Sequence, residues 1–224
     1  MHTRFLFLLI LLLGFANGTK SLAGPIDDLD PTPYALIRPA SAVVLHEDGS
    51  TTALSSVGFD GTGLSDPSPL RGAHSDDPND MIAVPFDGDS PVSIRYDLGS
   101  QYTVNELWLW QYNGEGETDR GMSDFDILFR NEDGQIVGQL AEAEVERAIG
   151  FDLPASYFCP TAESVRFVEL VIRDNYGDNT FVGLSDIAFA GRLRTISVPE
   201  SSSMAVALVL GLLSLAAVRR RSGR

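Results

Sequence analysis

Cysteine is almost absent from this chain of 224 residues, in which Cys159 is the only one. A single cysteine excludes an intramolecular disulfide, so packing must stabilise the fold, with or without help from a metal ion. Cys159 stands among apolar residues in the segment 157–160 (Tyr-Phe-Cys-Pro). We therefore expect a buried, inert thiol rather than a nucleophile.

Histidine is also rare, and none of the three lies in a sequence context typical of catalysis. His2 is part of the N-terminal targeting segment, and His46 and His74 have neither metal-ligand spacing nor a nucleophile motif around them. The sequence also lacks a Gly-x-Ser-x-Gly elbow, a His-Glu-x-x-His zinc motif and a phosphate-binding glycine loop. These absences predict that the chain is not an enzyme. The alternative is a polysaccharide hydrolase, whose paired carboxylates would come together only in three dimensions.

Positive charge is the third scarce feature. The chain has 16 Lys and Arg against 31 Asp and Glu, for a formal charge of -15. Several of the cations, among them Arg4, Lys20 and Arg224, lie in the terminal segments, so the middle is more acidic still. Nucleic acids and anionic lipids bind to basic patches on proteins. The acidic middle of this chain would attract neither of them by charge, so the composition argues against both as partners. The acidity is compatible with divalent cations, or it serves only to keep the protein soluble.

Residues 1–23 have the three parts of a secretory signal peptide. A short basic region with Arg4 precedes an apolar run from Phe5 to Leu13, and a small-residue site ends at Ala23. We expect export and cleavage after Ala23. A buried N-terminal helix is the alternative, but no polar residue interrupts the run to give such a helix a solvent face.

Residues 195–224 form a second targeting segment. A short motif over 198–201 precedes an apolar run of 15 residues over 204–218 and a basic cluster over 219–224. The marked residues are Val198, Pro199 and Glu200 of the motif and Arg219, Arg220 and Arg221 of the cluster. The run is shorter than the roughly 20 residues that cross a bilayer comfortably, and the cluster favours a cytoplasmic end.

This arrangement resembles the PEP-CTERM sorting signal, although Ser201 stands where the usual motif has a second proline. The resemblance implies an exported protein that the C-terminal helix anchors transiently in the inner membrane. It also implies an exosortase-type membrane protease as partner, and a final location at the cell surface or outside the cell, in association with exopolysaccharide and biofilm matrix. A plain single-span anchor is the alternative.

Between these ends we expect a proline-rich extended leader over 24–40 and one all-β domain over 41–194. Short apolar runs alternate with turn residues, without the rhythm of parallel β-α-β units. The predicted strands are 42–45, 92–98, 104–112, 125–129, 135–140, 165–172 and 184–190. The pattern indicates a β-sandwich or jelly roll.

Three local patterns support particular elements. Apolar and polar residues alternate over 92–98, which is typical of a strand with one buried face. The run 107–110 (Leu-Trp-Leu-Trp) is apolar on both faces, as in a central strand, and Trp108 and Trp110 are expected in the core. Asn131 to Gly134 separates two apolar runs and ends in the hairpin dipeptide Asp-Gly. Residues 141–149 are equally compatible with helix and strand.

Several fragments of the middle also occur in order and at the spacing of a known domain. These fragments are 59–65 (Phe-Asp-Gly-Thr-Gly-Leu-Ser), 74–81, 96–99 (Tyr-Asp-Leu-Gly), 104–110, 120–127, 165–170 and 175–187. Together they resemble a discoidin or coagulation factor 5/8 type C domain of the galactose-binding-like fold, over about residues 56–190. The chain departs from the family at Ile82, where an aromatic residue is common. The resemblance implies a jelly-roll β-sandwich whose end loops bind ligands, and a structural calcium ion.

The resemblance and the residue chemistry together name candidate sites. The candidate calcium ligands are Asp60, Asp186, Asp77, Asn79 and Asp80, since calcium takes carboxylate and carbonyl oxygens from loops at strand ends. A simple polar turn over 76–80 is the alternative. The candidate glycan ligands are Tyr112, Asn113, Arg120, His74 and Asn175, since sugar sites combine a flat apolar surface with a few fixed polar groups.

The sequence therefore predicts an exported, non-catalytic binding module, with extracellular carbohydrate or exopolysaccharide as the expected partner. The alternative is a structural matrix or surface protein without a defined glycan ligand.

Overall fold

The computed structural model describes residues 34–66, 72–150 and 153–194. The two predicted targeting segments, 1–23 and 195–224, lie outside these residues. In the described part no helix is long and apolar enough to cross a membrane. The strands are β1 (Ala35–Ile37), β2 (Ser41–Leu45), β3 (Thr51–Ala53), β4 (Ile82–Pro85), β5 (Val92–Gln111), β6 (Met122–Arg130), β7 (Ile136–Ala143), β8 (Ser156–Phe158), β9 (Ala162–Asn175) and β10 (Phe181–Leu193). Three single-turn 3-10 helices accompany them: η1 (Ser56–Gly58), η2 (Pro78–Asp80) and η3 (Thr118–Arg120).

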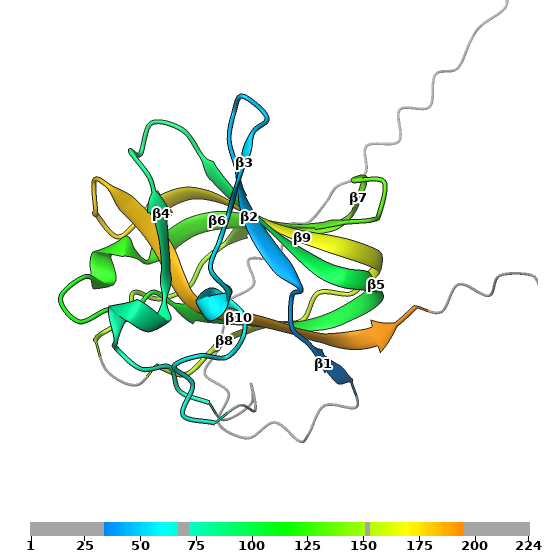
Figure 1. The fold of residues 1–224 in the computed structure, drawn as a ribbon, viewed down its shortest axis with the longest axis horizontal. Coiled ribbons are helices and arrows are strands. Elements are labelled where there is room, and N and C mark those ends of the chain that lie inside the picture. The colour runs from blue at the N-terminus through cyan, green and yellow to red at the C-terminus, as the bar shows by residue number, and fades with distance from the viewer. Residues whose placement is uncertain (1–33, 67–71, 151–152, 195–224) are drawn as a thin grey trace, which may run out of the picture. The chain divides into compact units, whose positions relative to one another are not determined.

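The long strand β5 organises the sheet, and all its pairings are antiparallel. Its first half pairs with β2 on one side and β9 on the other, whereas its second half pairs with β10 and β8. The strand bends where the halves meet, at Gly99, whose φ of 80° is accessible to glycine and whose amide donates to Asp97. The path then continues from β9 to β6 and β7, while β1 and β4 pair with β10. In Figure 1, β10 accordingly runs beneath the group formed by β2, β5, β6 and β9.

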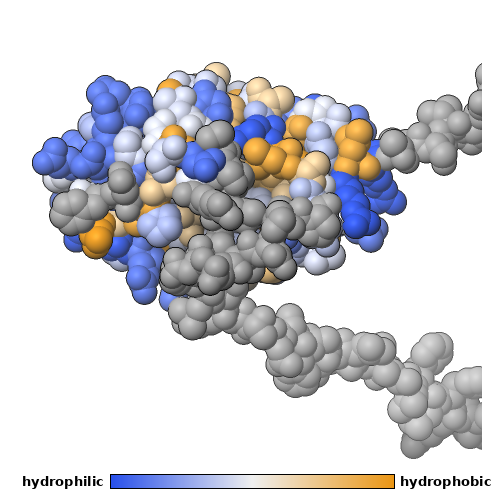
Figure 2. All heavy atoms as spheres, turned by 90° about the horizontal axis from the view of Figure 1, so that it is seen from below, coloured by the Kyte–Doolittle hydropathy of each residue, from blue (hydrophilic) through white to orange (hydrophobic). Residues whose placement is uncertain are grey.

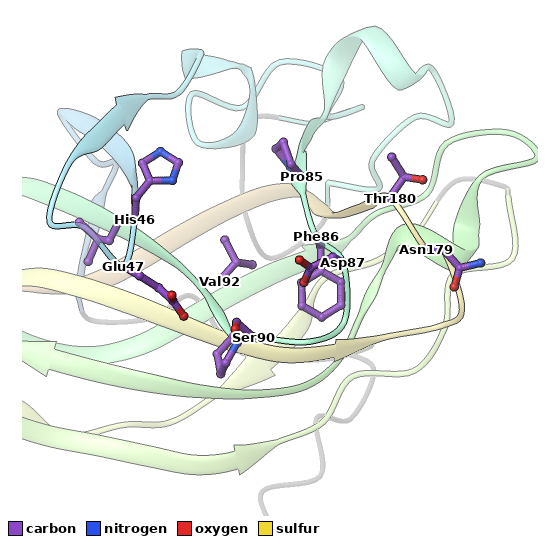
Figure 3. Close-up of a pocket in the computed structure, with 11 residues that line it drawn as sticks. His46, Glu47, Pro85, Phe86, Asp87, Ser90, Val92, Asn179 and Thr180 are labelled. Carbon is purple, nitrogen blue, oxygen red and sulfur yellow. The ribbon is translucent and has the colours of Figure 1, made fainter.

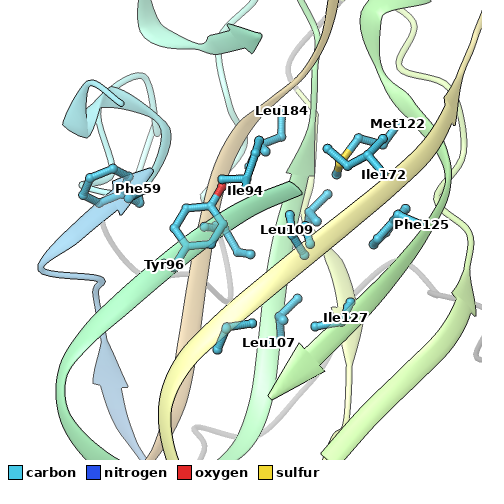
Figure 4. Packing of buried hydrophobic residues seen from close by; sticks show 14 of the residues in the cluster. Phe59, Ile94, Tyr96, Leu107, Leu109, Met122, Phe125, Ile127, Ile172 and Leu184 are labelled. Carbon is cyan, nitrogen blue, oxygen red and sulfur yellow. The ribbon is translucent and has the colours of Figure 1, made fainter. Parts of the chain in front are cut away.

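The main core is enclosed by side chains that alternate along these strands. On β5, Ile94 and Tyr96 face it from the first half, and Leu107 and Leu109 from the second. Figure 4 shows them packed with Phe125 and other apolar side chains of β6, β9 and β10. Burial of this many large apolar groups is the main source of stability for a chain without disulfides.

A second apolar cluster lies on the opposite face of β5 and β10. Trp108 and Trp110 of β5 pack there with Ala188 and Ala190 of β10, and Tyr157 stacks at 5.8 Å on Trp108. The Trp110 indole N–H donates to the carbonyl of Gly72 at 2.8 Å. Both tryptophans are fully buried, which confirms that they belong to the core.

The outer surface is largely hydrophilic, as the acidic composition indicates. Figure 2 shows hydrophilic residues gathered at the ends of one face, with hydrophobic residues in small groups between them. The exposed large apolar side chains include Ile136, Val137, Ile149 and Leu193.

The all-β prediction is confirmed, and so are its best-supported elements. Each predicted strand overlaps an observed one, with 92–98 and 104–112 joined into the single strand β5. The hairpin over 131–134 joins β6 to β7, and Gly134 adopts the φ of 77° that its turn requires. β1, β3, β4 and β8 were not predicted, because three or four residues carry too little periodicity to be recognised.

Residues 141–149, which were equally compatible with helix and strand, begin as strand, because 141–143 continue β7 and no helix follows over 144–149. Two expectations were wrong. The fold begins before Ser41, because β1 lies within the expected leader and pairs with β10. Cys159 is exposed rather than buried, because it follows the short strand β8, where the chain leaves the sheet with Pro160.

Candidate functional site: a pocket between three loops

A pocket of about 430 Å³ opens where three loops meet at one end of the sheet. The loops are the β2–β3 turn, the β4–β5 connection and the β9–β10 connection. Leu45, Pro85, Phe86, Pro91 and Val92 line it with apolar surface, and His46, Glu47, Asp87, Ser90, Asn179 and Thr180 line it with polar groups. Figure 3 shows Phe86 and Asp87 between the β2–β3 turn on one side and Asn179 on the other.

Short local hydrogen bonds fix the first two loops. In the β2–β3 turn, His46 Nε2 lies 2.8 Å from Thr52 Oγ1, and the Ser50 amide donates to Asp48 at 2.8 Å. In the β4–β5 loop the Asp89 amide donates to Asp87 at 3.0 Å. These turns form because aspartate side chains accept from the amide two residues ahead, a pattern that competes with regular strand pairing.

The third wall of the pocket is the β9–β10 loop, and one buried amide holds it. The Asn175 side chain donates to the carbonyls of Asp178 and Phe181 at 2.7 and 2.9 Å and accepts from the Gly177 amide at 2.8 Å. The loop is also joined to the second wall, because the Phe86 amide donates to the Thr180 carbonyl at 2.8 Å. Asn175 therefore positions the segment that carries Asn179 and Thr180.

Asp178 adds a second set of bonds inside the same loop. Its carboxylate accepts from the amides of Thr180 and Phe181 at 2.7 and 2.8 Å and from Arg120 Nε at 3.1 Å. Burial acts to raise the pKa of Asp178, but these hydrogen bonds and the guanidinium outweigh it and lower the pKa. The loop is therefore braced through an ionised carboxylate.

Arg120 carries this bracing across to the β5–β6 loop. Its guanidinium also pairs with Glu117 and lies 5.1 Å from the centre of the Phe181 ring and 5.9 Å from that of Tyr112. The Tyr112 hydroxyl donates to Glu117 at 3.1 Å. Arg120 and Tyr112 thus link the β5–β6 loop to the start of β10.

The residues predicted to bind a glycan are therefore buried in, or bonded to, other parts of the protein. Tyr112 is 2 % exposed, and Asn113 and His74 are fully buried. Asn113 accepts from the Gly150 amide at 3.0 Å, and the His74 ring packs against Gly63, where a Cβ atom would come within 2.7 Å. Burial lowers the pKa of His74, which favours the neutral ring. Of the five residues, Asn175 and Arg120 affect the pocket indirectly, because their hydrogen bonds stabilise the β9–β10 loop that forms one of its walls.

The pocket itself is formed by residues that the sequence analysis did not select. Asp-Gly dipeptides at 48–49 and 87–88 mark two of the loops as turns, and this is the one signal that pointed to them. Two carboxylates, Glu47 and Asp87, line the pocket, whereas no lysine or arginine appears among its described lining residues. Its charge therefore disfavours anionic ligands.

The predicted calcium ligands fall into two groups. Asp77 accepts from the Asn79 amide at 2.9 Å at the start of η2, and Asp80 accepts from the Ser75 hydroxyl at 3.2 Å. This arrangement fits the alternative of a polar turn. Asp186 instead pairs with the guanidinium of Arg38, which lies near enough to Asp60 to act to lower its pKa.

Arg38 is held against β10 by three hydrogen bonds. Its Nη1 donates to both oxygens of Asp186 at 2.9 and 2.8 Å and to the Ile187 carbonyl at 3.3 Å. Burial raises the pKa of Asp186 to about 6, although Arg38 acts to lower it. Asp60 accepts from Ser56 Oγ at 2.6 Å and from the Thr62 amide at 2.9 Å. Across the described residues, no three histidine, cysteine, aspartate or glutamate side chains are grouped to hold a metal ion. The carboxylates of Asp60 and Asp186 are therefore engaged in hydrogen bonds within the protein.

A separate acidic cleft of about 460 Å³ lies between β6, β9 and the end of β7. Asp124, Asp126, Glu142 and Glu144 line it, but Arg173 donates to Asp124 at 2.6 Å and also pairs with Asp126. The Arg173 guanidinium lowers the pKa of Asp126, the opposite of what a glycosidase general acid requires. The paired carboxylates of this cleft are thus committed to an ion pair.

Comparisons with known proteins give structural similarity alone. No protein-family model and no curated protein matches the sequence. Among solved structures, a fucose binding module of Streptococcus pneumoniae is 12 % identical, with a TM-score of 0.46 over 73 % of this chain and 99 % of that one. A mutant lectin binding domain of lectinolysin complexed with Lewis b is 18 % identical, with a TM-score of 0.44 over 69 % and 94 %. The CBM32 module of AlyQ in complex with 4,5-unsaturated mannuronic acid is 17 % identical, with a TM-score of 0.41 over 69 % and 97 %.

Proposed function

We propose that this protein is an exported, non-catalytic module that binds neutral glycans in the pocket between the β2–β3, β4–β5 and β9–β10 loops. The observation that carries the proposal is the composition of that pocket. Phe86, Pro85 and Pro91 give it an apolar surface, and hydroxyl, amide and carboxylate groups surround them. A sugar ring presents an apolar face and a belt of hydroxyls, so it matches such a lining.

Charge narrows the ligand class. Glu47 and Asp87 are hydrogen-bond acceptors for sugar hydroxyls, and without an arginine or lysine among its described lining residues the pocket offers no counter-charge to a uronate or sulfate. The formal charge of -15 for the whole chain adds long-range repulsion. The proposed ligand is therefore a neutral polysaccharide rather than an anionic one.

The targeting segments supply the place of action in this proposal. Residues 1–23 direct export and residues 195–224 direct transient membrane anchoring and cleavage by an exosortase-type protease. The domain then acts at the cell surface or in the exopolysaccharide matrix. Deleting residues 198–224 is expected to leave export intact and to abolish surface retention, as measured by cell fractionation and by the mass of the mature protein.

The binding proposal is tested with a panel of immobilised neutral and anionic polysaccharides that includes the producer's own exopolysaccharide. Ser90→Trp fills the pocket from an exposed position, and Asp133→Trp adds the same bulk to the β6–β7 turn, which does not line it. We expect saturable retention on at least one neutral glycan, a loss of tenfold or more for Ser90→Trp and no loss for Asp133→Trp. Equal retention of both variants would exclude this pocket, and no retention of the unmodified domain would favour the structural matrix protein.

A further inference from the structure

The strongest unexplained feature of the fold is the ion pair that ties Arg38 to Asp186. Asp186 lies in the middle of β10 with a fully buried side chain, whereas the Arg38 side chain is 20 % exposed. Arg38 directly follows β1, whose residue Ile37 pairs with Phe189 of β10. The segment before Ser41 is thus held to the domain by three backbone pairs with β10, by the Ala40 amide that donates to the Asp97 carbonyl at 2.7 Å, and by this charge pair.

The surroundings of Asp186 show why a cation is needed there. A buried carboxylate without a partner is costly, and both Asp186 oxygens are used, since Oδ1 accepts from Arg38 and from the Ile187 amide at 2.7 Å while Oδ2 accepts from Arg38. Asp60 adds a second negative charge near it. The Asp186 carboxylate and the Ile187 carbonyl both accept from Arg38, and carboxylate and carbonyl oxygens are the groups that a calcium ion also uses.

The guanidinium also lies against the loop that follows Asp60. A Cβ atom at Gly61 would come within 3.1 Å of Arg38 Nη2, so the arginine packs directly over the 60–62 loop. Asp60 turns its oxygens inward to Ser56 and Thr62, which leaves the loop stabilised by its own hydrogen bonds. The carboxylates that the sequence resemblance assigned to calcium are therefore satisfied by the protein itself.

We propose that Arg38 is a built-in cation that takes the place of calcium at Asp186, beside the loop that carries Asp60, so that the domain folds without a divalent ion. The segment 34–40 is then an integral part of the domain rather than a leader. The proposal does not depend on what the domain binds, because neither Arg38 nor Asp186 lines the pocket.

The test is thermal unfolding of residues 24–197, followed by circular dichroism with excess calcium and with EDTA. Arg38→Met keeps the apolar length but removes the charge, and Arg166→Met is the matched control, since Arg166 pairs with Asp97 where both side chains are about a quarter exposed. We expect the same Tm for the unmodified domain in both buffers, a fall of roughly 8 °C for Arg38→Met and a fall of about 2 °C or less for the control. Adding Asp186→Asn to Arg38→Met should recover most of the loss, because a neutral amide needs no counter-charge.

Two results would overturn the proposal. One is a Tm of the unmodified domain that falls by several degrees in EDTA or rises by several degrees with calcium, because a divalent ion would then be bound. The other is an Arg38→Met variant as stable as the Arg166→Met control. If Arg38→Met does not fold, the single variants Asp186→Asn and Arg38→Lys decide, with little loss expected for the first and partial loss for the second.

Discussion

Replacing Asn175 by alanine tests whether the polar residues of this end of the molecule position the pocket rather than contact the ligand. The side chain makes three hydrogen bonds of 2.7, 2.8 and 2.9 Å within the β9–β10 loop. Each contributes about 1 kcal/mol net, which gives an upper value of about 3 kcal/mol. Gly177 is exposed and Asp178 and Phe181 are half-buried, so water can replace part of the lost bonding. We therefore expect the free energy of unfolding to fall by about 2 kcal/mol.

The same change should weaken ligand binding, although Asn175 does not line the pocket. Without its amide the segment 176–180 must become ordered when a glycan binds, and ordering costs on the order of 1 kcal/mol per fixed residue. We expect the Kd to rise by about tenfold, which corresponds to about 1.4 kcal/mol. Urea unfolding measures the first quantity and titration calorimetry with the retained oligosaccharide measures the second.

The matched control is Asn131→Ala in the hairpin away from the pocket, where the side chain accepts from the Gln135 amide at 2.9 Å and donates weakly to Gln135 Oε1 at 3.4 Å. It should cost about 1 kcal/mol or less and leave the Kd unchanged. The reasoning is refuted if Asn175→Ala lowers stability no more than this control. A normal stability loss with an unchanged Kd would show that the β9–β10 wall does not contribute to binding.

Three further predictions follow from single interactions. The pKa of Asp178 is lowered in the fold, so its contribution to stability is complete above the unfolded value of 3.8 and is lost as the pH falls through the lower folded value. Glycan binding should therefore hold at pH 5 and fall below pH 4. An Asp178→Asn variant should lack that acid transition. Glu169 accepts from Arg95 at 2.7 Å and from Arg130 at 3.0 Å and is 5 % exposed. Glu169→Ala should therefore lower the free energy of unfolding in urea by about 2 kcal/mol. A loss below about 0.5 kcal/mol would show that water replaces the carboxylate fully. Because Cys159 is exposed, iodoacetamide should alkylate it in the folded domain without changing the circular dichroism spectrum, whereas alkylation only in urea would show that the thiol is shielded.

The strands that the sequence predicted are those whose pattern is local. The alternation over 92–98 and the apolar run 107–110 reflect burial on one face and on both faces, and burial acts on every residue of a long strand. The Asp-Gly turn at 133–134 is equally local, since its conformation depends on the glycine itself. Short strands such as β1 and β8 form because a neighbouring strand offers backbone hydrogen-bond partners. The local sequence pattern does not indicate that such partners are present.

The site was less predictable, because it depends on which loops the topology brings together. Asn175 and Arg120 carry the polar groups that sugar sites use, but in the fold these groups bond to Asp178 and Glu117 of their own loops. Asp60 and Asp186 were named as calcium ligands, and in the fold Arg38 pairs with Asp186 and packs over the loop that follows Asp60. The arginine itself lies in a segment whose prolines indicated a leader, so the sequence alone did not show that it would supply the cation.

The most direct test of the binding pocket is an NMR titration of the isotope-labelled domain with the neutral oligosaccharide that the panel retains best. We predict saturable amide shifts concentrated in residues 45–47, 85–92 and 179–180, the residues of the three pocket loops. Shifts centred instead on residues 112–122, or shifts spread evenly without saturation, would contradict the assignment of this pocket as the glycan site.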